Sequence, residues 1–225
     1  MFTGLVQCQG NVDAIERQDY GVRLEISYPV DQLTPTPKHG DSVAINGCCL
    51  THTGDQSTPS GKLIFHVIHE TLEKTTIGNL QVGSSVNLEP AVTASTPMGG
   101  HFVQGHVDTT GKITAIQNNA DDYRITIQTP DNFTPYIVPK GSICIDGVSL
   151  TIAATDAPNN SFQIALIPTT LEITNLGKAV VGNTVNLEAD MIAKTVVNFL
   201  QHQFGDTQQS ELTMDKLKAA GFLNS

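Results

Sequence analysis

The sequence repeats itself at an interval close to one hundred residues. "HETLEKTTIGNLQVGSSVNLEPA" starts at 69 and its relative "PTTLEITNLGKAVVGNTVNLEAD" at 168, while "GDSVAINGCCLT" and "KGSICIDGVSLT" start at 40 and 140. An interval held this constant is typical of two related modules in tandem. We therefore predict a first module over residues 1–97, a second over 98–190 and a tail over 191–225. The stretch 89–100, rich in Pro, Ser, Thr and Gly, is the expected linker.

The apolar residues of each module alternate as they do in half-buried strands. "VRLEISY", "SVAIN", "KLIFHVI" and "SVNLE" are short and rich in β-branched residues, and they recur at the spacing of β-sandwiches or barrels. Asn46-Gly47 and Asp146-Gly147 are typical two-residue hairpin turns. Because closure removes exposed edge strands, we expect an all-β chain with each module a small closed barrel. One helical turn is expected near residues 31–33.

The tail has a different period. In "MIAKTVVNFLQHQF" (191–204) the apolar residues fall on one face of a helix, namely Ile192, Val196, Phe199, Leu200 and Phe204. A second short helix is predicted over 210–222. An apolar helical stripe outside both barrels needs a partner surface, which is either its own barrel or the same helix of other subunits. The sequence leaves both open.

Composition and charge exclude several classes of protein. The net charge of −10 and the absence of a basic stripe argue against a nucleic-acid partner. The chain has no apolar run long enough for a membrane helix and no signal-peptide core, so we expect a cytoplasmic protein. Neither of the usual Gly-rich phosphate-binding motifs occurs, and the four cysteines contain no C-x-x-C pair, so neither a cofactor nor a metal is expected.

One repeated strand differs between the copies at its polar face. Alternation places Cys49 and Thr51 on one face of the first copy, and Ser149 and Thr151 on the corresponding face of the second. The opposite face is apolar in both copies, so Cys48 is expected in the core. A hydroxyl orients a ligand by hydrogen bonding, whereas a thiol is polarizable and nucleophilic as thiolate. The exchange indicates two related pockets with different roles, although a small half-buried residue at this position would also explain it.

Further differences lie close to this face. His106 stands where the first copy has Leu5, and imidazole is the usual proton shuttle near neutral pH. Lys140 stands opposite Gly40, and Asp190 stands opposite Ala91. These three are candidate site residues, although a structural histidine and solvated surface charges are the simpler interpretations. His101 is expected only to anchor the linker.

Six motifs in register resemble the riboflavin synthase family, of the α-chain type built from lumazine-binding repeats. They are "MFTG", "NGCCLT", "GGHFVQGHVD", "DGVSLT", "IPTTLEITNLG" and "VNLEAD". The resemblance implies two six-stranded Greek-key barrels plus a C-terminal helix, and a homotrimer whose sites form between barrels of neighbouring subunits. It also implies a transferase that completes riboflavin biosynthesis without metal or redox cofactor. Two molecules of 6,7-dimethyl-8-ribityllumazine are converted to riboflavin and 5-amino-6-ribitylaminouracil. A lumazine synthase shell is a possible further partner.

The resemblance also supplies site residues. The positions linked to turnover are Phe2, Cys49, His106, Ser149 and Asp190. Ligand contacts assigned to the first barrel are Gly4, Leu5, Val6, Cys49, Leu50, Thr51, His66, Val67, Ile68, His69, Glu70 and Thr71. The remaining contacts are Gly105, His106, Val107, Lys140, Ser149, Leu150, Thr151, Ile167, Pro168, Thr169, Thr170, Leu171 and Glu172.

Two other functions fit parts of the pattern. Lumazine proteins share this fold and bind a lumazine or flavin as an optical antenna, but they lose part of the polar set of the second module. The barrel of a flavin-dependent reductase is disfavoured because no nucleotide-binding domain follows. Which barrel holds the donor molecule, and whether His106 or a water takes the proton, stay open.

Overall fold

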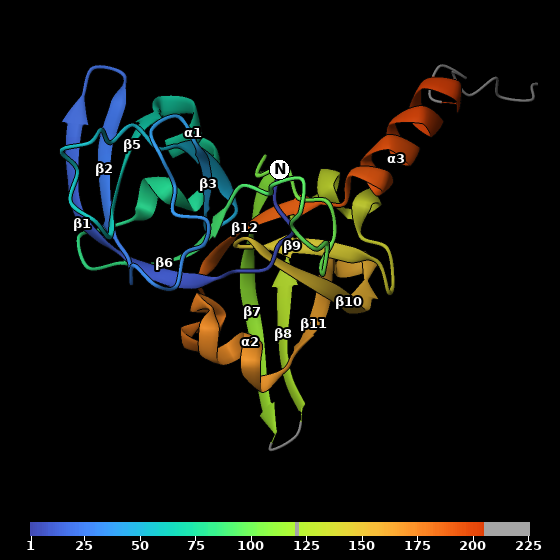
Figure 1. The fold of residues 1–225 in the computed structure, drawn as a ribbon. Coiled ribbons are helices and arrows are strands. Elements are labelled where there is room, and N and C mark those ends of the chain that lie inside the picture. Colours follow the sequence, from blue (N-terminus) through green and yellow to red (C-terminus); the bar gives the residue numbers. More distant parts are fainter. Residues whose placement is uncertain (120–121, 205–225) are drawn as a thin grey trace, which may run out of the picture.

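The computed structural model describes residues 1–119 and 122–204, which form two β modules followed by a helix. The modules lie side by side, and the N-terminus lies between them (Figure 1). Each is built from six antiparallel strands. The strand content and the doubling predicted from the repeat are therefore confirmed.

The strands of the N-terminal module are β1 (Cys8–Gln18), β2 (Gly21–Ser27), β3 (Ser42–Ile45), β4 (Cys48–Thr51), β5 (Lys62–Ile68) and β6 (Ser85–Pro90). A short helix α1 (His69–Lys74) and a 3₁₀ turn η1 (Thr76–Asn79) connect β5 to β6. The strand order across the sheet is β4-β3-β6-β1-β2-β5.

The C-terminal module repeats this arrangement. Its strands are β7 (Thr109–Asn119), β8 (Asp122–Gln128), β9 (Ser142–Ile145), β10 (Val148–Asp156), β11 (Ser161–Leu166) and β12 (Thr184–Ala189). Its helical pieces are η2 (Asp131–Tyr136), η3 (Ala157–Asn159), α2 (Pro168–Ile173) and η4 (Asn175–Lys178). Read from β10, the order β10-β9-β12-β7-β8-β11 corresponds strand by strand to that of the first module.

The two modules differ in how their sheets close. In the C-terminal module β10 pairs with β11 from Ile152 onward and completes a closed barrel. In the N-terminal module β4 ends at Thr51, and a single bridge between His52 and Phe65 joins the end strands. There the imidazole Nδ1 of buried His52 accepts a hydrogen bond from the Ile64 N–H at 3.1 Å, so a side chain replaces part of the ladder. Strict closure, predicted for both modules, holds for the second.

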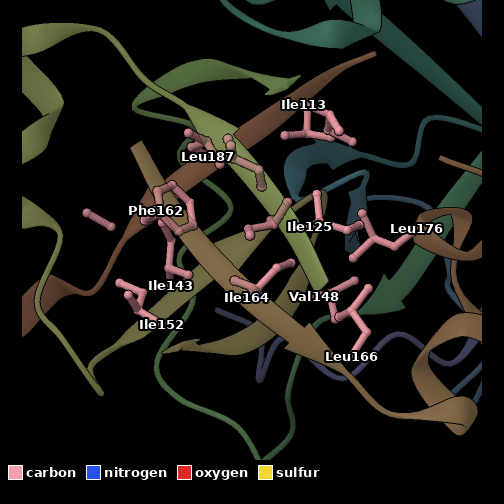
Figure 2. Packing of buried hydrophobic residues seen from close by; sticks show 14 of the residues in the cluster. Ile113, Ile125, Ile143, Val148, Ile152, Phe162, Ile164, Leu166, Leu176 and Leu187 are labelled. Carbon is pink, nitrogen blue, oxygen red and sulfur yellow. The ribbon is translucent and has the colours of Figure 1, made fainter. Parts of the chain in front are cut away.

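Each module has its own apolar core, supplied by the inward residues of alternating strands. In the C-terminal module the side chains of Ile113, Ile125, Ile143, Phe162 and Ile164 point toward a common centre (Figure 2). A fully buried side chain of this size stabilises a fold by about 1.5–3 kcal/mol. The expected helical turn at residues 31–33 is instead a hydrogen-bonded turn, although its counterpart η2 is helical.

The two predicted hairpin turns are confirmed, and they touch each other. Asn46 and Asp146 have φ values of 44° and 46°, and each is followed by a glycine with φ of 75° or 82°. A Cβ on Gly47 would lie 2.6 Å from the backbone nitrogen of Gly147. Only glycine fits both the left-handed backbone and this approach, so the N-G and D-G pairs also determine how closely the modules pack.

The predicted C-terminal helix is α3 (Met191–Phe204), and it projects away from both modules (Figure 1). Of its apolar stripe, Ile192, Val196, Phe199 and Leu200 are between 47% and 66% exposed. The module to which α3 is attached therefore leaves much of this stripe uncovered. The second predicted helix, 210–222, lies outside the described residues. No helix in the described ranges has the length and apolar character to cross a bilayer.

Candidate functional site

Each module donates a short segment to the other at the strand that carries the Cys-to-Ser exchange. The connecting segment (residues 102–108) lies along β4 of the N-terminal module, where the Gly105 carbonyl accepts a hydrogen bond from the Cys49 N–H at 2.8 Å. The N-terminal segment (residues 1–7) lies along β10 of the C-terminal module, where the Gly4 carbonyl accepts from the Ser149 N–H at 2.7 Å. Each segment thus precedes one module in the sequence and packs against the other, and we call the two the crossed segments.

The crossing requires glycine at both contact points. Gly4 and Gly105 have φ values of 75° and 80°, which other residues rarely adopt. A Cβ on Gly4 would lie 2.6 Å from the Cβ of Ser149, and a Cβ on Gly105 would lie 2.6 Å from that of Cys49. Glycine therefore allows each segment to contact the strand beside its reactive side chain.

This geometry corrects the grouping of contacts inferred from the sequence. The family resemblance grouped Gly4–Val6 with Cys49 in the first barrel, and it placed Gly105–Val107 among the remaining contacts with Ser149. The structure reverses both assignments, since Val6 packs into the C-terminal core and Val107 against the N-terminal core. The segment that precedes each barrel in the sequence therefore packs against the other barrel.

The strand β4 of the N-terminal module carries the Cys49 thiol, and the segment that packs against it carries His106. Cys49 is half-buried, while Cys48 and Leu50 are buried, as alternation along β4 predicted. His106 follows Gly105 and is exposed beside this strand. Of the other expected contacts, Thr51, His66, Ile68, His69 and Glu70 are exposed, Thr71 is half-buried and Val67 is buried. The structure thus brings the segment that carries His106 against the strand that carries Cys49.

On β10 of the C-terminal module, a serine hydroxyl is hydrogen-bonded to a different imidazole. Ser149 Oγ lies 2.7 Å from Nδ1 of His101. Burial lowers the pKa of His101, and the negative charge of Asp190 acts in the opposite direction. Nε2 of His101 is buried without a hydrogen-bond partner among the described residues. Burial therefore favours the neutral form of this ring, which is hydrogen-bonded to the serine hydroxyl.

His101 is a site residue that the sequence interpretation missed. It was assigned to linker anchoring because it lies just before the second module and has no distinctive counterpart in the first. The available signal was its place in "GGHFVQGH", where Gly100 allows close approach. A Cβ at Gly100 would lie 2.1 Å from the Thr3 carbonyl and 3.0 Å from Ser149 Oγ.

Most of the remaining expected contacts have exposed side chains. Leu5, Lys140, Thr151, Ile167, Pro168, Thr169 and Glu172 are exposed, and Leu150, Thr170 and Leu171 are half-buried. Asp190 is half-buried and caps α3, because its Oδ1 accepts from the Ile192 N–H at 2.9 Å. Asp190 therefore caps α3 and also places a negative charge near His101.

Phe2 occupies a different position from the other turnover candidates. Its side chain is fully buried in a cluster with Ala44, Val103 and Cys144 at the contact between the modules. Its backbone bonds to Val103 in both directions, at 2.7 and 3.1 Å. The structure thus places Phe2 between the two crossed segments, in a cluster against which the side chain of Cys49 packs.

The other thiols are sites of low reactivity. Burial raises the pKa of Cys8 to about 11 and that of Cys48 to about 12, and it raises the pKa of Cys144 well above its usual range. Because the thiolate is the nucleophile, these three are inert near neutral pH. No cluster of three or more potential metal ligands occurs in residues 1–119 and 122–204.

Comparison with known proteins defines the class of protein. The lumazine binding domain family matches the chain twice, over residues 3–91 and 104–190. A crystal structure of LumP complexed with 6,7-dimethyl-8-(1'-D-ribityl) lumazine has a TM-score of 0.73 at 28% identity, covering 84% of this chain and 99% of LumP. The LumP complex with riboflavin gives a TM-score of 0.74 at 29% identity over the same shares of the chains. The chain is a lumazine-binding β protein.

Full-length relatives narrow the family. Riboflavin synthase of Mycobacterium bovis is 43% identical over 89% of this chain and 98% of its own length. The riboflavin synthases of Actinobacillus pleuropneumoniae and Bacillus subtilis are 40% and 35% identical, each over 99% of this chain and 100% of the relative. The chain belongs to the riboflavin synthase family and is a transferase.

Proposed function

We propose that this chain converts two molecules of 6,7-dimethyl-8-ribityllumazine to riboflavin and 5-amino-6-ribitylaminouracil, with one molecule bound in each module's pocket. Four carbon atoms pass from one lumazine to the other. Atoms and electrons balance between the two substrates and the two products, so the overall reaction has no external oxidant or reductant. A repeated module fits a reaction that uses one substrate twice.

The observation that carries the proposal is the difference between two otherwise equivalent pockets. The N-terminal pocket combines the Cys49 thiol with the exposed imidazole of His106, whereas the C-terminal pocket combines the Ser149 hydroxyl with the half-buried imidazole of His101. We assign His106 as the base that removes a proton from the 7-methyl group of the donor. Cys49 is assigned to the acceptor ring, as nucleophile or as partner of an activated water.

We further propose that a productive site forms between subunits of a homotrimer. Leu5, Ile68, Ile167 and Phe102 are between 47% and 64% exposed near the pockets, and the stripe of α3 is also exposed. An assembly that pairs an N-terminal pocket with a C-terminal pocket of a neighbour would cover such residues and hold two rings face to face. Orientation of this kind accounts for roughly 7–11 kcal/mol of a reaction barrier.

The deciding experiment supplies the purified chain with the lumazine alone and follows riboflavin absorbance. The expected result is formation of riboflavin and the aminouracil in equal amounts, without added nucleotide. Two lumazine molecules disappear for each riboflavin formed. Tight retention of ligand without turnover would instead identify an optical antenna of the LumP kind and contradict the proposal.

A further inference from the structure

Two buried carboxylates hold the crossed segments, and the proposed chemistry does not use either of them. Glu188 on β12 accepts hydrogen bonds from the backbone N–H groups of Gln104 and Gly105, at 2.7 and 2.9 Å. Its counterpart Glu89 on β6 accepts from the N–H groups of Thr3 and Gly4, at 2.7 and 3.0 Å. Both side chains belong to residues that are no more than 4% exposed.

A carboxylate suits this task because it has two acceptor oxygens. Each carboxylate accepts from the N–H groups of two successive residues, one at each oxygen, so the orientation of the intervening peptide is fixed. Burial raises the pKa of both Glu89 and Glu188, while the donated N–H bonds act in the opposite direction. The isosteric glutamine has one acceptor oxygen and presents an NH₂ group to the second N–H, which then has no acceptor.

Each carboxylate belongs to one module but holds a segment that bonds to the other module. Glu188 is part of the C-terminal sheet, but the segment it holds bonds to Cys49 through Gly105 and carries His106. Glu89 is part of the N-terminal sheet and lies opposite Ala44, the residue that pairs with Cys49. Even so, the segment it holds bonds to Ser149 through Gly4.

We propose that Glu188 is a positioning residue for the Cys49–His106 pocket of the N-terminal module and that Glu89 is the positioning residue for the Ser149 pocket. Glu89 also accepts from the Thr3 hydroxyl at 2.8 Å, so it holds its segment by one more bond than Glu188 does. The segment bearing His106 is consequently the more sensitive of the two. The catalytic part of this inference rests on the proposed function.

The test compares Glu188→Gln with Glu89→Gln in the full chain, with Cys49 as a local reporter. Cys49 is half-buried, whereas Cys8, Cys48 and Cys144 are buried, so a small neutral reagent such as iodoacetamide distinguishes them. The rate at Cys49 is followed by peptide mass spectrometry. We expect Glu188→Gln to accelerate it about tenfold and Glu89→Gln to leave it within about twofold of the unmodified chain. Labelling of the three buried thiols reports unfolding.

Kinetics on the same samples provide the second measurement. Glu188→Gln is expected to lower kcat about tenfold with a smaller change in KM, because the ligand-binding faces stay folded while His106 is displaced. Glu188→Asp retains the charge but shortens its reach, and it replaces the glutamine variant if that variant fails to fold. Equal acceleration at Cys49 by both glutamine variants, or none by either, would overturn the crosswise assignment. The alkylation result stands whether or not the chain turns over lumazine.

Discussion

The two modules share a framework and differ in the groups that face the pockets. Both have the same strand order, the same left-handed hairpin residue followed by glycine, and the same glycine contact with a segment from the other module. They differ at Cys49 and Ser149 and at His106 and Leu5. Duplication retained the residues that determine backbone geometry, while the side chains that act on a ligand diverged.

The crossing of segments increases this difference. Gly105 bonds to Cys49 on β4, so the following residue, His106, lies beside the strand that carries the thiol. Gly4 bonds to Ser149 on β10, so Leu5 lies beside the strand that carries the hydroxyl. The N-terminal pocket thus receives its imidazole from the sequence of the second repeat. Cys49 and Ser149 therefore each lie against a segment of the other repeat.

The largest effect is expected from α3, which has no counterpart in the N-terminal module. The double variant Ile192→Glu/Phe199→Glu places charge on its exposed apolar stripe. If productive sites form between subunits, activity should fall at least roughly a thousandfold, since the two rings are no longer held together. Sedimentation and the riboflavin assay measure this. Asn198→Glu, a polar exposed position on the same helix, is the matched control. A trimer that survives the double variant would show that α3 does not hold the assembly.

The next effect concerns the exchanged strand position. Cys49→Ser makes the first pocket resemble the second and should lower kcat about a hundredfold, which is typical for loss of a group that acts in the chemical step. Ser149→Cys should lower kcat less, because its hydroxyl orients through His101 at 2.7 Å. Cys48→Ala removes a buried side chain and should reduce stability by about 1 kcal/mol with kcat unchanged. A larger loss of kcat in Cys48→Ala than in Cys49→Ser would show that Cys48, and not Cys49, faces the ligand.

A stability difference is expected at the hairpin turns, where Asn46 is neutral and Asp146 is a buried acid. Burial raises the pKa of Asp146 to about 7, despite hydrogen bonds from Asn186 and Asn175. The folded chain therefore binds this proton more tightly than the unfolded chain. Ionisation of the buried Asp146 lowers the free energy of unfolding. This loss of stability is absent below about pH 4, grows between about pH 4 and 7 and is complete above pH 7.

Asp146→Asn should accordingly stabilise the fold by about 1–3 kcal/mol at pH 8, and this gain should disappear as the pH approaches 4. Part of the gain is offset because the new amide loses the bond that Asn175 donates to Oδ2 at 3.2 Å. Denaturant unfolding from pH 5 to 8.5 checks this. Asn46→Asp, the reciprocal change, should destabilise most at high pH. A pH-independent difference would mean that Asp146 is not the titrating group.

The smallest effect is expected where Lys140 stands opposite Gly40. Both residues have positive φ, 65° and 89°, and a lysine pays a steric penalty there that glycine avoids. Lys140→Gly should raise stability by about 0.5–1 kcal/mol but weaken lumazine binding, because it removes the proposed ligand contact. Lys140→Ala retains the strain and loses only the ammonium group. Thermal unfolding and ligand titration of both variants separate the two contributions, and equal stability of the two would remove strain as the explanation.

Local sequence was sufficient for the elements and for several candidate side chains. Alternation along 48–51 placed Cys48 in the core and Cys49 on the polar face, because successive strand residues point in opposite directions. The N-G and D-G pairs located both hairpins, and the helical period located α3. These features depend on residues a few positions apart, so a single sequence records them.

The sequence by itself determined that there are two related β modules, a terminal helix and one strand whose reactive group changes between copies. Only the tertiary structure decided which segment meets which pocket, that His101 bonds to Ser149, and that Glu188 holds the stretch before His106. These contacts join residues at least 48 positions apart, and a backbone hydrogen bond between distant segments leaves no periodic pattern in the sequence of either segment. The repeat predicted two related pockets with different roles, whereas the packing of the two modules against each other decided which segment lies beside Cys49 and which beside Ser149.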